Sequence, residues 1–383
     1  MLGYMQRIYL DNACTSWPKA PHLGEVMTSF FENNGSNINR GDYKSAYGTS
    51  LAVDQVRDQL GLLFGSSKSN CISFTLNVTE ALNFLIKGMF TIKDHVLVSS
   101  MEHNAVMRPL VQSNIPFSRI PSDRDGHMLL DSVPSLIRKN TKAIIMTAAS
   151  NVCGTIQPYR ELCEIAKEHN LLFFLDSAQA APYVPLKLEE YGFDAIAFTG
   201  HKGLLGPQGV GGLVLSEAVA HSLNPLISGG TGSASDSEEV PPYLPDRMEA
   251  GTQNIPGILA LGSAMDFLTK HQPELQENER LRGEELLEGM KGIRNMHICG
   301  PQDIREMVPV ISVDFPFSDN AEIAYLLSNR YGIETRVGLH CSPSAHKSLG
   351  TFPKGTIRFS PGPFTKKDEI DTTIRALKEV AIG

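Results

Sequence analysis

Short apolar runs alternate with amphipathic segments through the first two thirds of the chain. Five of these runs have the apolar pattern and the polar borders of buried strands. They cover residues 71–75, 94–100, 143–150, 171–175 and 194–198. Segments with apolar residues at helical spacing lie between them, such as 45–64 and 158–169, the second with proline in its first turn. This alternation predicts an α/β fold around a mostly parallel sheet, with a further strand at 210–215.

The last third of the chain has a different pattern. Residues 228–254 are rich in Gly, Ser, Pro and acidic residues, which predicts a long functional loop. A smaller α+β unit should follow, with helices at 256–271, 275–290, 320–331 and 365–380, and strands near 308–313, 333–337 and 356–360. We therefore expect a large domain of residues 16–255, and a small one formed by residues 1–15 and 256–383.

Composition and charge narrow the classes of function. The chain has 383 residues, of which 42% are hydrophobic and 20% charged, as is ordinary for a soluble globular enzyme. A net charge of −8 argues against nucleic-acid binding through phosphate neutralisation. The start has no secretory pattern and no apolar run could span a bilayer, so we expect a cytoplasmic protein without a membrane partner. Six scattered cysteines, without a Cys-x-x-Cys pair, predict neither a disulfide framework nor a metal site.

One lysine follows a buried strand in a setting that favours covalent chemistry. Lys202 stands between Thr199 and His201 on one side and the glycine-rich run 203–212 on the other. Glycines allow other groups to approach closely, which suits a lysine that bonds to a carbonyl cofactor. An exposed loop lysine is the simpler alternative. A nucleotide-binding site is disfavoured, because the glycine run fits neither the dinucleotide nor the phosphate-loop pattern.

Polar residues follow the other predicted strands as well. His103, Asn151, Asp176 and Gln179 come just after the C-terminal ends of strands, as Lys202 does. Ligands bind at that edge in open parallel sheets. Each residue has a structural alternative, such as a turn former for Asp176 or a helix cap for Asn151. Five of them at one edge favour a binding site.

A strand that leads directly into a helix predicts an anion cradle. Asn77 is a good N-cap, and Glu80 stands three residues later, as in a capping box. Such a helix start presents free N–H groups and the positive end of the helix dipole. Thr79 adds a hydroxyl. On its own, the segment favours a plain helix start.

Eight short motifs, taken in order, resemble one known family. They occupy residues 9–13, 79–81, 101–103, 150–152, 176–179, 199–202, 249–252 and 336–341. This set covers nearly the whole chain and resembles the class V aminotransferases, which are fold-type I pyridoxal-phosphate enzymes. Within that family it is most similar to the branch of cysteine desulfurases and selenocysteine lyases. The resemblance implies a seven-stranded-type, mostly parallel sheet in the large domain.

The resemblance implies a site for pyridoxal 5'-phosphate. Lys202 would hold this cofactor as a Schiff base, and once freed would remove the Cα proton of the substrate. Asp176 would pair with the pyridine nitrogen and stabilise the protonated ring. His103 would stack on the ring and relay a proton, and Gln179 would bond the ring hydroxyl.

The resemblance also implies where the cofactor phosphate binds. Its ligands would lie at the helix start, at Val78 and Thr79, and beside the lysine, at Thr199 and His201. In the family, the threonine of the Gly-Thr pair reaches the phosphate of the neighbouring subunit, so Thr252 would serve the partner's site. A homodimer with shared active sites is therefore implied.

Substrate contacts follow from the same resemblance. Arg358 matches the arginine that binds the substrate carboxylate, for which a planar and permanently charged fork is well suited. Asn151, which is also expected at the cofactor, Asn12 and Arg40 would be further contacts, with Arg40 coming from the other subunit. A surface arginine on a strand is the simpler alternative for Arg358.

Cys341 determines which reaction is expected. In the desulfurase branch, a cysteine at this position attacks the sulfur of L-cysteine and leaves L-alanine and an enzyme persulfide. The thiolate is the reactive form, which Arg336 nearby would favour. An inert buried cysteine is the simpler alternative. The usual Arg-Thr-Gly-His-His-Cys motif is altered at Val337 and Leu339. An aminotransferase, or a lyase acting on selenocysteine or another β-substituted amino acid, therefore stays the alternative, and a protein sulfur acceptor is a further expected partner.

Overall fold

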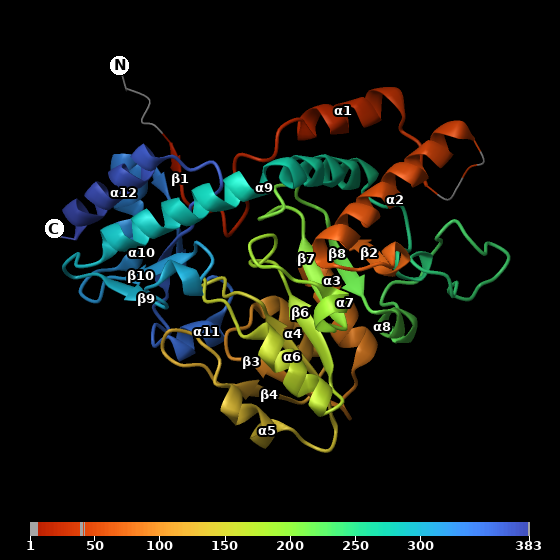
Figure 1. The fold of residues 1–383 in the computed structure, drawn as a ribbon, viewed down its shortest axis with the longest axis horizontal. Coiled ribbons are helices and arrows are strands. Elements are labelled where there is room, and N and C mark those ends of the chain that lie inside the picture. Colours follow the sequence, from red (N-terminus) through yellow and green to blue (C-terminus); the bar gives the residue numbers. More distant parts are fainter. Residues whose placement is uncertain (1–6, 39–40, 42, 382–383) are drawn as a thin grey trace.

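Two units joined by one long helix make up the structure. The computed structural model describes residues 7–38, 41 and 43–381. Figure 1 shows a larger unit around a central sheet, and a smaller unit that contains the C-terminal segment. Helix α9 (Ile255–Met290) runs across both units, with α1 (Leu23–Asn33) and α2 (Lys44–Phe64) against its first half.

The large unit is built on a seven-stranded sheet. The strands are β2 (Ile72–Thr75), β3 (His95–Ser99), β4 (Phe117–Ile120), β5 (Thr141–Thr147), β6 (Leu172–Asp176), β7 (Ala195–Thr199) and β8 (Gly211–Leu215). Their order is β2-β8-β7-β6-β5-β3-β4. Only β8 is antiparallel to its neighbours, so the predicted mostly parallel sheet is confirmed. The sequence pattern did not reveal β4, a short edge strand with only one fully buried residue, Ile120.

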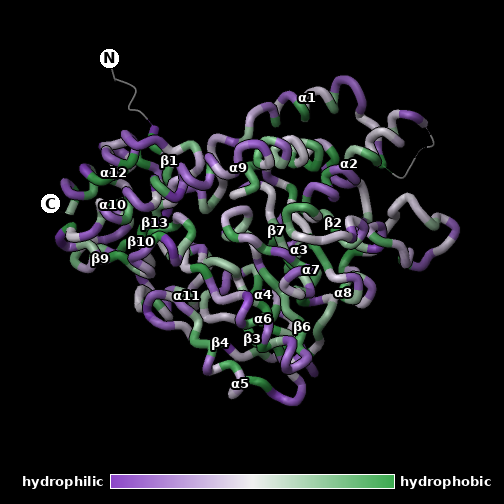
Figure 2. The backbone as a smooth tube through the Cα atoms, in the orientation of Figure 1, coloured by the Kyte–Doolittle hydropathy of each residue, from purple (hydrophilic) through white to green (hydrophobic). Residues whose placement is uncertain are grey.

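Helices cover both faces of this sheet. Successive strand residues enter different apolar clusters, as Ile144 and Ile145 of β5 do, because side chains alternate between the two faces. Helices α3 (Val78–Met89), α4 (Asn104–Gln112) and α8 (Glu217–Ser222) pack on one face. The other face is covered by α2, α6 (Tyr159–Glu168), α7 (Leu188–Tyr191) and the first half of α9. A short helix α5 (Val133–Leu136) lies near β4. Figure 2 shows the strands as mostly hydrophobic and the outer helices as mixed.

Two helix predictions need correction. Pro158 precedes α6 as its N-cap instead of lying in its first turn. The two helices expected at 256–271 and 275–290 are a single helix, α9, with Pro273 inside it. A proline usually breaks a helix. Here the helix continues because its two halves are held separately, with Leu261 in the core of the large unit and Leu286 in the core of the small one.

The small unit combines the two ends of the chain. Its four-stranded antiparallel sheet has the order β12-β13-β10-β9, from β9 (His297–Cys299), β10 (Ile311–Asp314), β12 (Arg336–Gly338) and β13 (Thr356–Phe359). Strand β1 (Ile8–Tyr9) pairs in parallel with β11 (Ile333–Glu334). Helices α10 (Asn320–Tyr331), α11 (Pro343–Ser348) and α12 (Lys367–Val380) complete the unit. The expected strand at 333–337 is thus two short strands in different sheets. The division of the chain at residue 255 stays a prediction.

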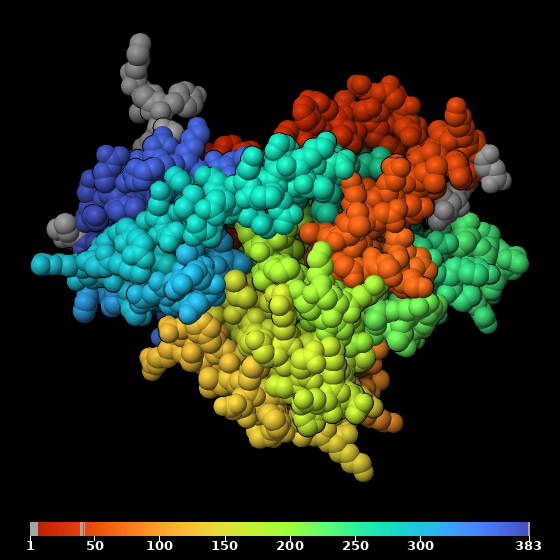
Figure 3. Space-filling view, viewed as in Figure 1, coloured from red at the N-terminus to blue at the C-terminus, as the bar shows by residue number. Residues whose placement is uncertain are grey.

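The two units meet above the carboxyl ends of the parallel strands. The isolated bridge between Asp11 and Ser360 ties the N-terminal segment to the strand end of the small unit. Figure 3 shows the C-terminal segment and the sheet unit in contact beneath α9. Within the described residues, no helix combines the length and the apolar character that crossing a bilayer needs.

Candidate active site

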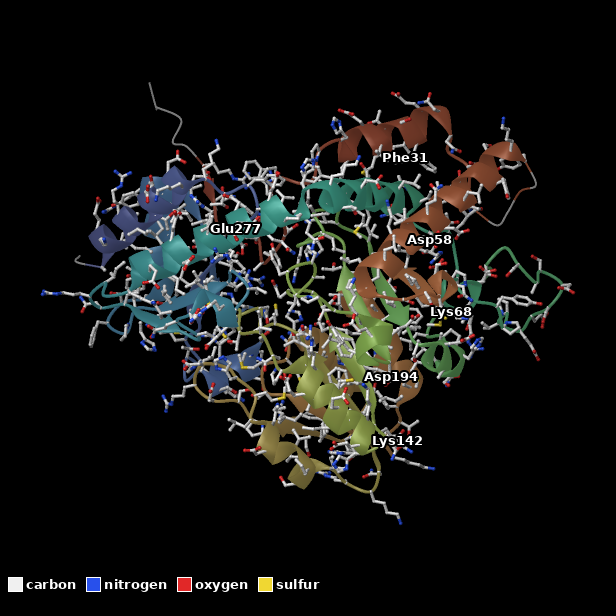
Figure 4. The ribbon with its side chains drawn as sticks, in the orientation of Figure 1. Phe31, Asp58, Lys68, Lys142, Asp194 and Glu277 are labelled. Carbon is white, nitrogen blue, oxygen red and sulfur yellow. The ribbon has the colours of Figure 1, made fainter. Side chains whose placement is uncertain are left out.

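The carboxyl ends of the strands bring the predicted residues together. Asp176 ends β6, Lys202 follows β7, and His103 caps α4 after β3. His103 and Asp176 are both close enough to Lys202 to interact with its charge. Figure 4 labels Lys142 and Asp194, which stand at the opposite, amino-terminal edge of the sheet. The sheet therefore places this polar group at the edge where α/β proteins bind ligands.

The surroundings of Lys202 favour the neutral form of its amine more than water does. Its side chain is half-buried, and burial lowers the pKa of Lys202 to about 8, with Asp176 opposing this effect and Arg358 adding to it. Its Nζ has no hydrogen-bond partner among residues 7–38, 41 and 43–381. A neutral amine is the form that attacks a carbonyl. The exposed loop lysine considered from the sequence is therefore the wrong alternative.

Asp176 presents a buried carboxylate beside this lysine. Only 3% of the residue is exposed, and its Oδ1 accepts a hydrogen bond of 2.9 Å from the Ala178 N–H. Burial raises the pKa of Asp176, while the Ala178 N–H and Lys202 lower it. A buried carboxylate with one committed oxygen is suited to pair with a cationic ring N–H.

His103 is held as a neutral imidazole. Its Nδ1 lies 3.0 Å from the Ala105 N–H, which can only donate, so Nδ1 must be the acceptor. Burial lowers the pKa of His103 to about 4, and the positive charges of Lys202 and Arg336 add to this effect. At neutral pH the ring proton therefore lies on Nε2.

The start of α3 leaves N–H groups free, as predicted. The Asn77 Oδ1 accepts from the Glu80 N–H at 3.0 Å, and the Glu80 Oε2 accepts from the Leu76 N–H at 2.6 Å. Both capping bonds bypass Val78 and Thr79, the first two residues of the helix. Their N–H groups stay open to an anion.

A buried hydroxyl without a partner in the described chain lies at the end of β7, the strand that precedes Lys202. The Oγ1 of Thr199 is inaccessible to solvent and has no hydrogen-bond partner in the described part of the chain. Thr199 pairs with Gly211, where a Cβ would lie only 2.7 Å from the Cα of Asn77. Glycine at 211 therefore lets β8 approach the start of α3. Leaving a buried hydroxyl unpaired costs about 1–3 kcal/mol, which a phosphate oxygen would relieve.

His201 completes this side of the site. Its Nδ1 lies 3.1 Å from the Thr15 Oγ1, and its carbonyl accepts a 2.7 Å hydrogen bond from the Lys19 Nζ. Burial lowers the pKa of His201 to about 4, and Lys202 and Lys19 add to the effect. Burial also lowers the pKa of Lys19 to about 8. The residues at this end fit a phosphate group.

Arg358 is a buried cation with spare donors. The residue is 1% exposed, so it is not the surface arginine of the simpler alternative. Its Nη2 donates to the Asp11 Oδ1 at 2.8 Å and its Nη1 to the Asn151 carbonyl at 2.9 Å. The Nε is buried without a partner among the described residues. A carboxylate that reaches this guanidinium would meet an unused donor.

The amides of Asn151 and Gln179 are used within the chain. The Asn151 Nδ2 donates to the His340 carbonyl, and its Oδ1 accepts from the Ser342 hydroxyl, both at 2.7 Å. The Gln179 Nε2 donates to the Ala13 carbonyl at 2.8 Å. Asn151 therefore fixes the two neighbours of Cys341 to the end of β5. Direct contacts of these amides with a ligand stay predictions.

Two of the three remaining predicted contact residues are described, and Asn12 lines a pocket together with Lys202 and Gln179. The Asn12 Nδ2 donates to the Ser360 carbonyl at 3.0 Å, and its Oδ1 accepts from a backbone N–H in the next turn. Thr252 is exposed, and its hydroxyl accepts a 3.3 Å hydrogen bond from the Asn37 side chain. Arg40 lies outside the described residues.

Cys341 is exposed, which excludes the inert buried cysteine. Its Sγ lies 3.6 Å from the Nη2 of Arg336. Its carbonyl accepts a 2.8 Å hydrogen bond from the Asn104 N–H, next to His103. The thiol therefore stands beside a cation, on a loop that is docked on the proposed cofactor site.

Comparison with known proteins identifies the family. A family model described as Aminotransferase class-V matches residues 8–373. The chain belongs to the class-V aminotransferase family. The cysteine desulfurase IscS of Dictyoglomus turgidum is 30% identical over 395 residues, covering 98% of this chain and 94% of the relative. A probable cysteine desulfurase of Methanothermobacter thermautotrophicus is 29% identical over 382 residues, covering 98% and 94%.

A solved structure shares this fold over nearly the whole chain. The apo structure of a cysteine desulfurase from Thermococcus onnurineus NA1 is 26% identical, with a TM-score of 0.90. The match covers 98% of this chain and 95% of the other. The expected fold-type I architecture is therefore confirmed. In the described part of the chain, no group of three or more His, Cys, Asp or Glu side chains could hold a metal ion.

Sequence reasoning missed three residues that contact the predicted site residues. Asp11 binds Arg358, Lys19 binds the His201 carbonyl, and the Sγ of Cys14 lies 3.6 Å from the Nη1 of Arg336. Asp11 lies within the motif at 9–13 and Cys14 directly follows it, which was the available signal. Lys19 has no such signal, because a lysine in a turn is ordinary.

Proposed function

We propose that this protein is a pyridoxal-5'-phosphate-dependent cysteine desulfurase. It converts L-cysteine to L-alanine and keeps the sulfur as a persulfide on Cys341. The names of the relatives support this reading. The observation that carries it is the exposed Cys341 thiol, which the Arg336 guanidinium contacts at 3.6 Å on a loop docked beside His103.

The residues present fit the cofactor. Lys202 would hold it covalently, and Asp176 would face its ring nitrogen. The free N–H groups of Val78 and Thr79 and the unpaired Thr199 hydroxyl would hold its phosphate. When bound, the cofactor supplies an electron sink that stabilises negative charge at the substrate Cα.

Proton transfer falls to Lys202 and His103. Because its pKa is lowered to about 8, roughly a tenth of the Lys202 amine is neutral at pH 7, far more than for an ordinary lysine, and this form can accept the Cα proton. The neutral His103 offers its Nε2–H, since Nδ1 is occupied by the Ala105 N–H. The two groups therefore supply a base and a proton donor.

Arg358 orients the substrate by its carboxylate. Its buried guanidinium has an unused Nε, and it shares the Asp11 carboxylate only through Nη2. A substrate carboxylate would compete with Asp11 for this cation. Desolvation strengthens that attraction, because charges interact more strongly away from water.

The Cys341 thiolate then attacks the sulfur of the substrate. A sulfur–sulfur bond forms and the substrate carbon–sulfur bond breaks, with its electron pair kept by carbon and then protonated. L-cysteine and the enzyme thiol thus become L-alanine and an enzyme persulfide, without any external oxidant. Arg336 stabilises the thiolate by hydrogen bonding.

A homodimer is part of the proposal. Several large apolar side chains are exposed, among them Tyr47 and Leu51 on α2, Leu76 before α3, and Leu226 and Ile227 before the long loop. A second subunit would cover such side chains. The partner's site would receive Thr252 and Arg40. A protein that accepts the sulfur, and a cytoplasmic location, complete the proposal.

The test is an assay with L-cysteine as the sole substrate. Alanine and sulfide should appear in equal amounts when a reductant is present, and Cys341→Ala should abolish both while the cofactor absorbance stays unchanged. Transfer of the amino group to a keto acid, with no sulfide, would support an aminotransferase instead. Turnover of selenocysteine but not of cysteine would support a selenocysteine lyase.

A further inference from the structure

Two thiols from distant parts of the chain share one guanidinium. Arg336 donates from Nη1 to the Cys14 Sγ and from Nη2 to the Cys341 Sγ, at 3.6 Å in both cases. Cys14 and Arg336 are 322 positions apart in the sequence. Two sulfur atoms on one side chain of the site indicate shared chemistry.

The other cysteines behave differently. The structure describes all six, and Cys71, Cys153, Cys163 and Cys299 are buried, whereas Cys14 is half-buried and Cys341 exposed. Burial raises the pKa of each of the four buried thiols, which makes them poor nucleophiles. Cys14 is therefore the second thiol with both access and cationic neighbours.

Cys14 also lies within electrostatic range of two other residues of the candidate site. A thiolate at Cys14 would be attracted by Lys202 and Arg358 as well as by Arg336. Its backbone N–H donates to the Asp11 carbonyl at 3.0 Å, and the Asp11 carboxylate holds Arg358 at 2.8 Å. The turn that carries Cys14 is thus fixed to the arginine proposed to bind the substrate.

We propose that Cys14 is a second sulfur carrier, which takes the outer sulfur of the Cys341 persulfide. This inference rests on the proposed desulfurase function. The Cys14 thiolate attacks the outer sulfur, a sulfur–sulfur bond forms at Cys14, and the sulfur–sulfur bond at Cys341 breaks. Cys341 leaves as a thiolate, and the proton stays on the transferred sulfur. One persulfide and one thiolate are present before and after, so no oxidant or reductant is consumed.

Arg336 makes the exchange balanced in charge. The negative charge begins on Cys14 at Nη1 and ends on Cys341 at Nη2, so the same cation stabilises both states. The Cys14 and Cys341 thiols contact different nitrogens of Arg336, which keeps them apart. In the persulfide, the outer sulfur lies one sulfur–sulfur bond, about 2.05 Å, beyond the Cys341 Sγ, so the Cys14 Sγ has less distance to cover. Once relieved of its sulfur, Cys341 is ready for another substrate molecule.

The test locates the persulfide by mass spectrometry. The holoenzyme is mixed with L-cysteine without reductant or acceptor, quenched with iodoacetamide and digested. The wild type should carry persulfide on both the Cys14 and the Cys341 peptides. Its initial burst of alanine should be twice that of Cys14→Ser, which should carry persulfide on Cys341 alone. Cys341→Ser should form neither persulfide.

A conservative variant and the cofactor spectrum keep the result interpretable. Arg336→Lys retains the charge but loses the forked donors, so persulfide should accumulate on Cys341 at the expense of Cys14. Unchanged cofactor absorbance in every variant confirms an intact site. Alanine formation with persulfide on Cys341 only, and an equal burst in Cys14→Ser, would overturn the carrier role but not the desulfurase. A Cys14–Cys341 disulfide with release of sulfide would also overturn it, and absence of alanine in the wild type would overturn both.

Discussion

The pocket around Lys202 and the loop around Cys341 differ in burial and in what their proposed roles require. Asp176 ends β6 and Lys202 follows β7, and both strands are paired on both sides and buried on both faces. Cys341 is an exposed residue on a loop where His340 and Cys341 have φ values of 47° and 60° and Gly338 has 112°. A covalently held cofactor needs fixed surroundings, whereas a sulfur carrier must reach the substrate and then an acceptor.

The loop is nevertheless anchored on either side of its thiol. His340 is 3% exposed and its Nε2 bonds the Thr356 hydroxyl at 3.1 Å, while Ser342 is fully buried on Asn151. These anchors hold two non-glycine residues in left-handed conformations, which cost on the order of 1–3 kcal/mol each. The fold therefore exposes the Cys341 side chain while the residues on either side of it are buried and hydrogen-bonded.

The largest effect is expected in the buried pocket. Lys202→Ala should lower the rate of alanine formation by on the order of 10³-fold or more, because it removes both the covalent attachment and the base. The measurement is alanine production under saturating L-cysteine and cofactor. Lys142→Ala, an exposed lysine at the opposite edge of the sheet in Figure 4, is the control and should match the wild type. Full activity in Lys202→Ala would refute the assignment of the pocket.

A smaller effect is expected where the loop is anchored. Ser342→Ala leaves the buried Asn151 Oδ1 without its 2.7 Å donor, a loss of about 1–3 kcal/mol that should loosen the loop. Alanine formation should fall by about ten- to a hundredfold, while cofactor affinity stays the same. Both are measured on the same preparation. If cofactor affinity fell as much as alanine formation, the loop and the pocket would form one structural unit, which would contradict the difference drawn between them.

The pH should affect the pocket through Lys202. Its lowered pKa of about 8 means that the rate of covalent cofactor attachment to the apoprotein should rise about tenfold per pH unit below 8 and then level off. The folded apoprotein holds this proton less tightly than the unfolded chain. The lysine's contribution to stability therefore increases from about pH 8 to about pH 10.4. Stopped-flow absorbance gives the profile, and an inflection near pH 10 would be inconsistent with the buried amine.

The smallest effect is expected at the phosphate end. Thr199→Val removes a hydroxyl that lacks a partner in the described chain, so the apoprotein should be as stable as the wild type or more so. The cofactor should bind about five- to tenfold more weakly, since one hydrogen bond to its phosphate is lost. Chemical denaturation and cofactor titration measure the two quantities. A less stable apoprotein with unchanged cofactor affinity would show that the Thr199 hydroxyl has a structural role only.

Local patterns predicted the sheet and most of the pocket. The strands preceding His103, Asp176 and Lys202 are short apolar runs with polar ends, and such runs carry their own signal. The break expected near Pro273 did not occur, because packing of both halves of α9 outweighs the local preference of one proline.

Long-range contacts were beyond the sequence pattern. Nothing near Cys14 indicates that it meets Arg336, because the small unit is built from both ends of the chain. The burial of Arg358 and its bond to Asp11 depend on the same closure. Residue types therefore suggested the chemistry, and only the folded chain showed which groups are already bonded to one another.

The most direct test of the account is the fate of sulfur in Cys341→Ala. The variant is purified with its cofactor, given L-cysteine, and assayed for alanine and for persulfide on every cysteine peptide. The account predicts unchanged cofactor absorbance, no persulfide and no alanine, because the pocket is intact but the thiol that attacks sulfur is gone. Alanine formation at the wild-type rate would contradict the account.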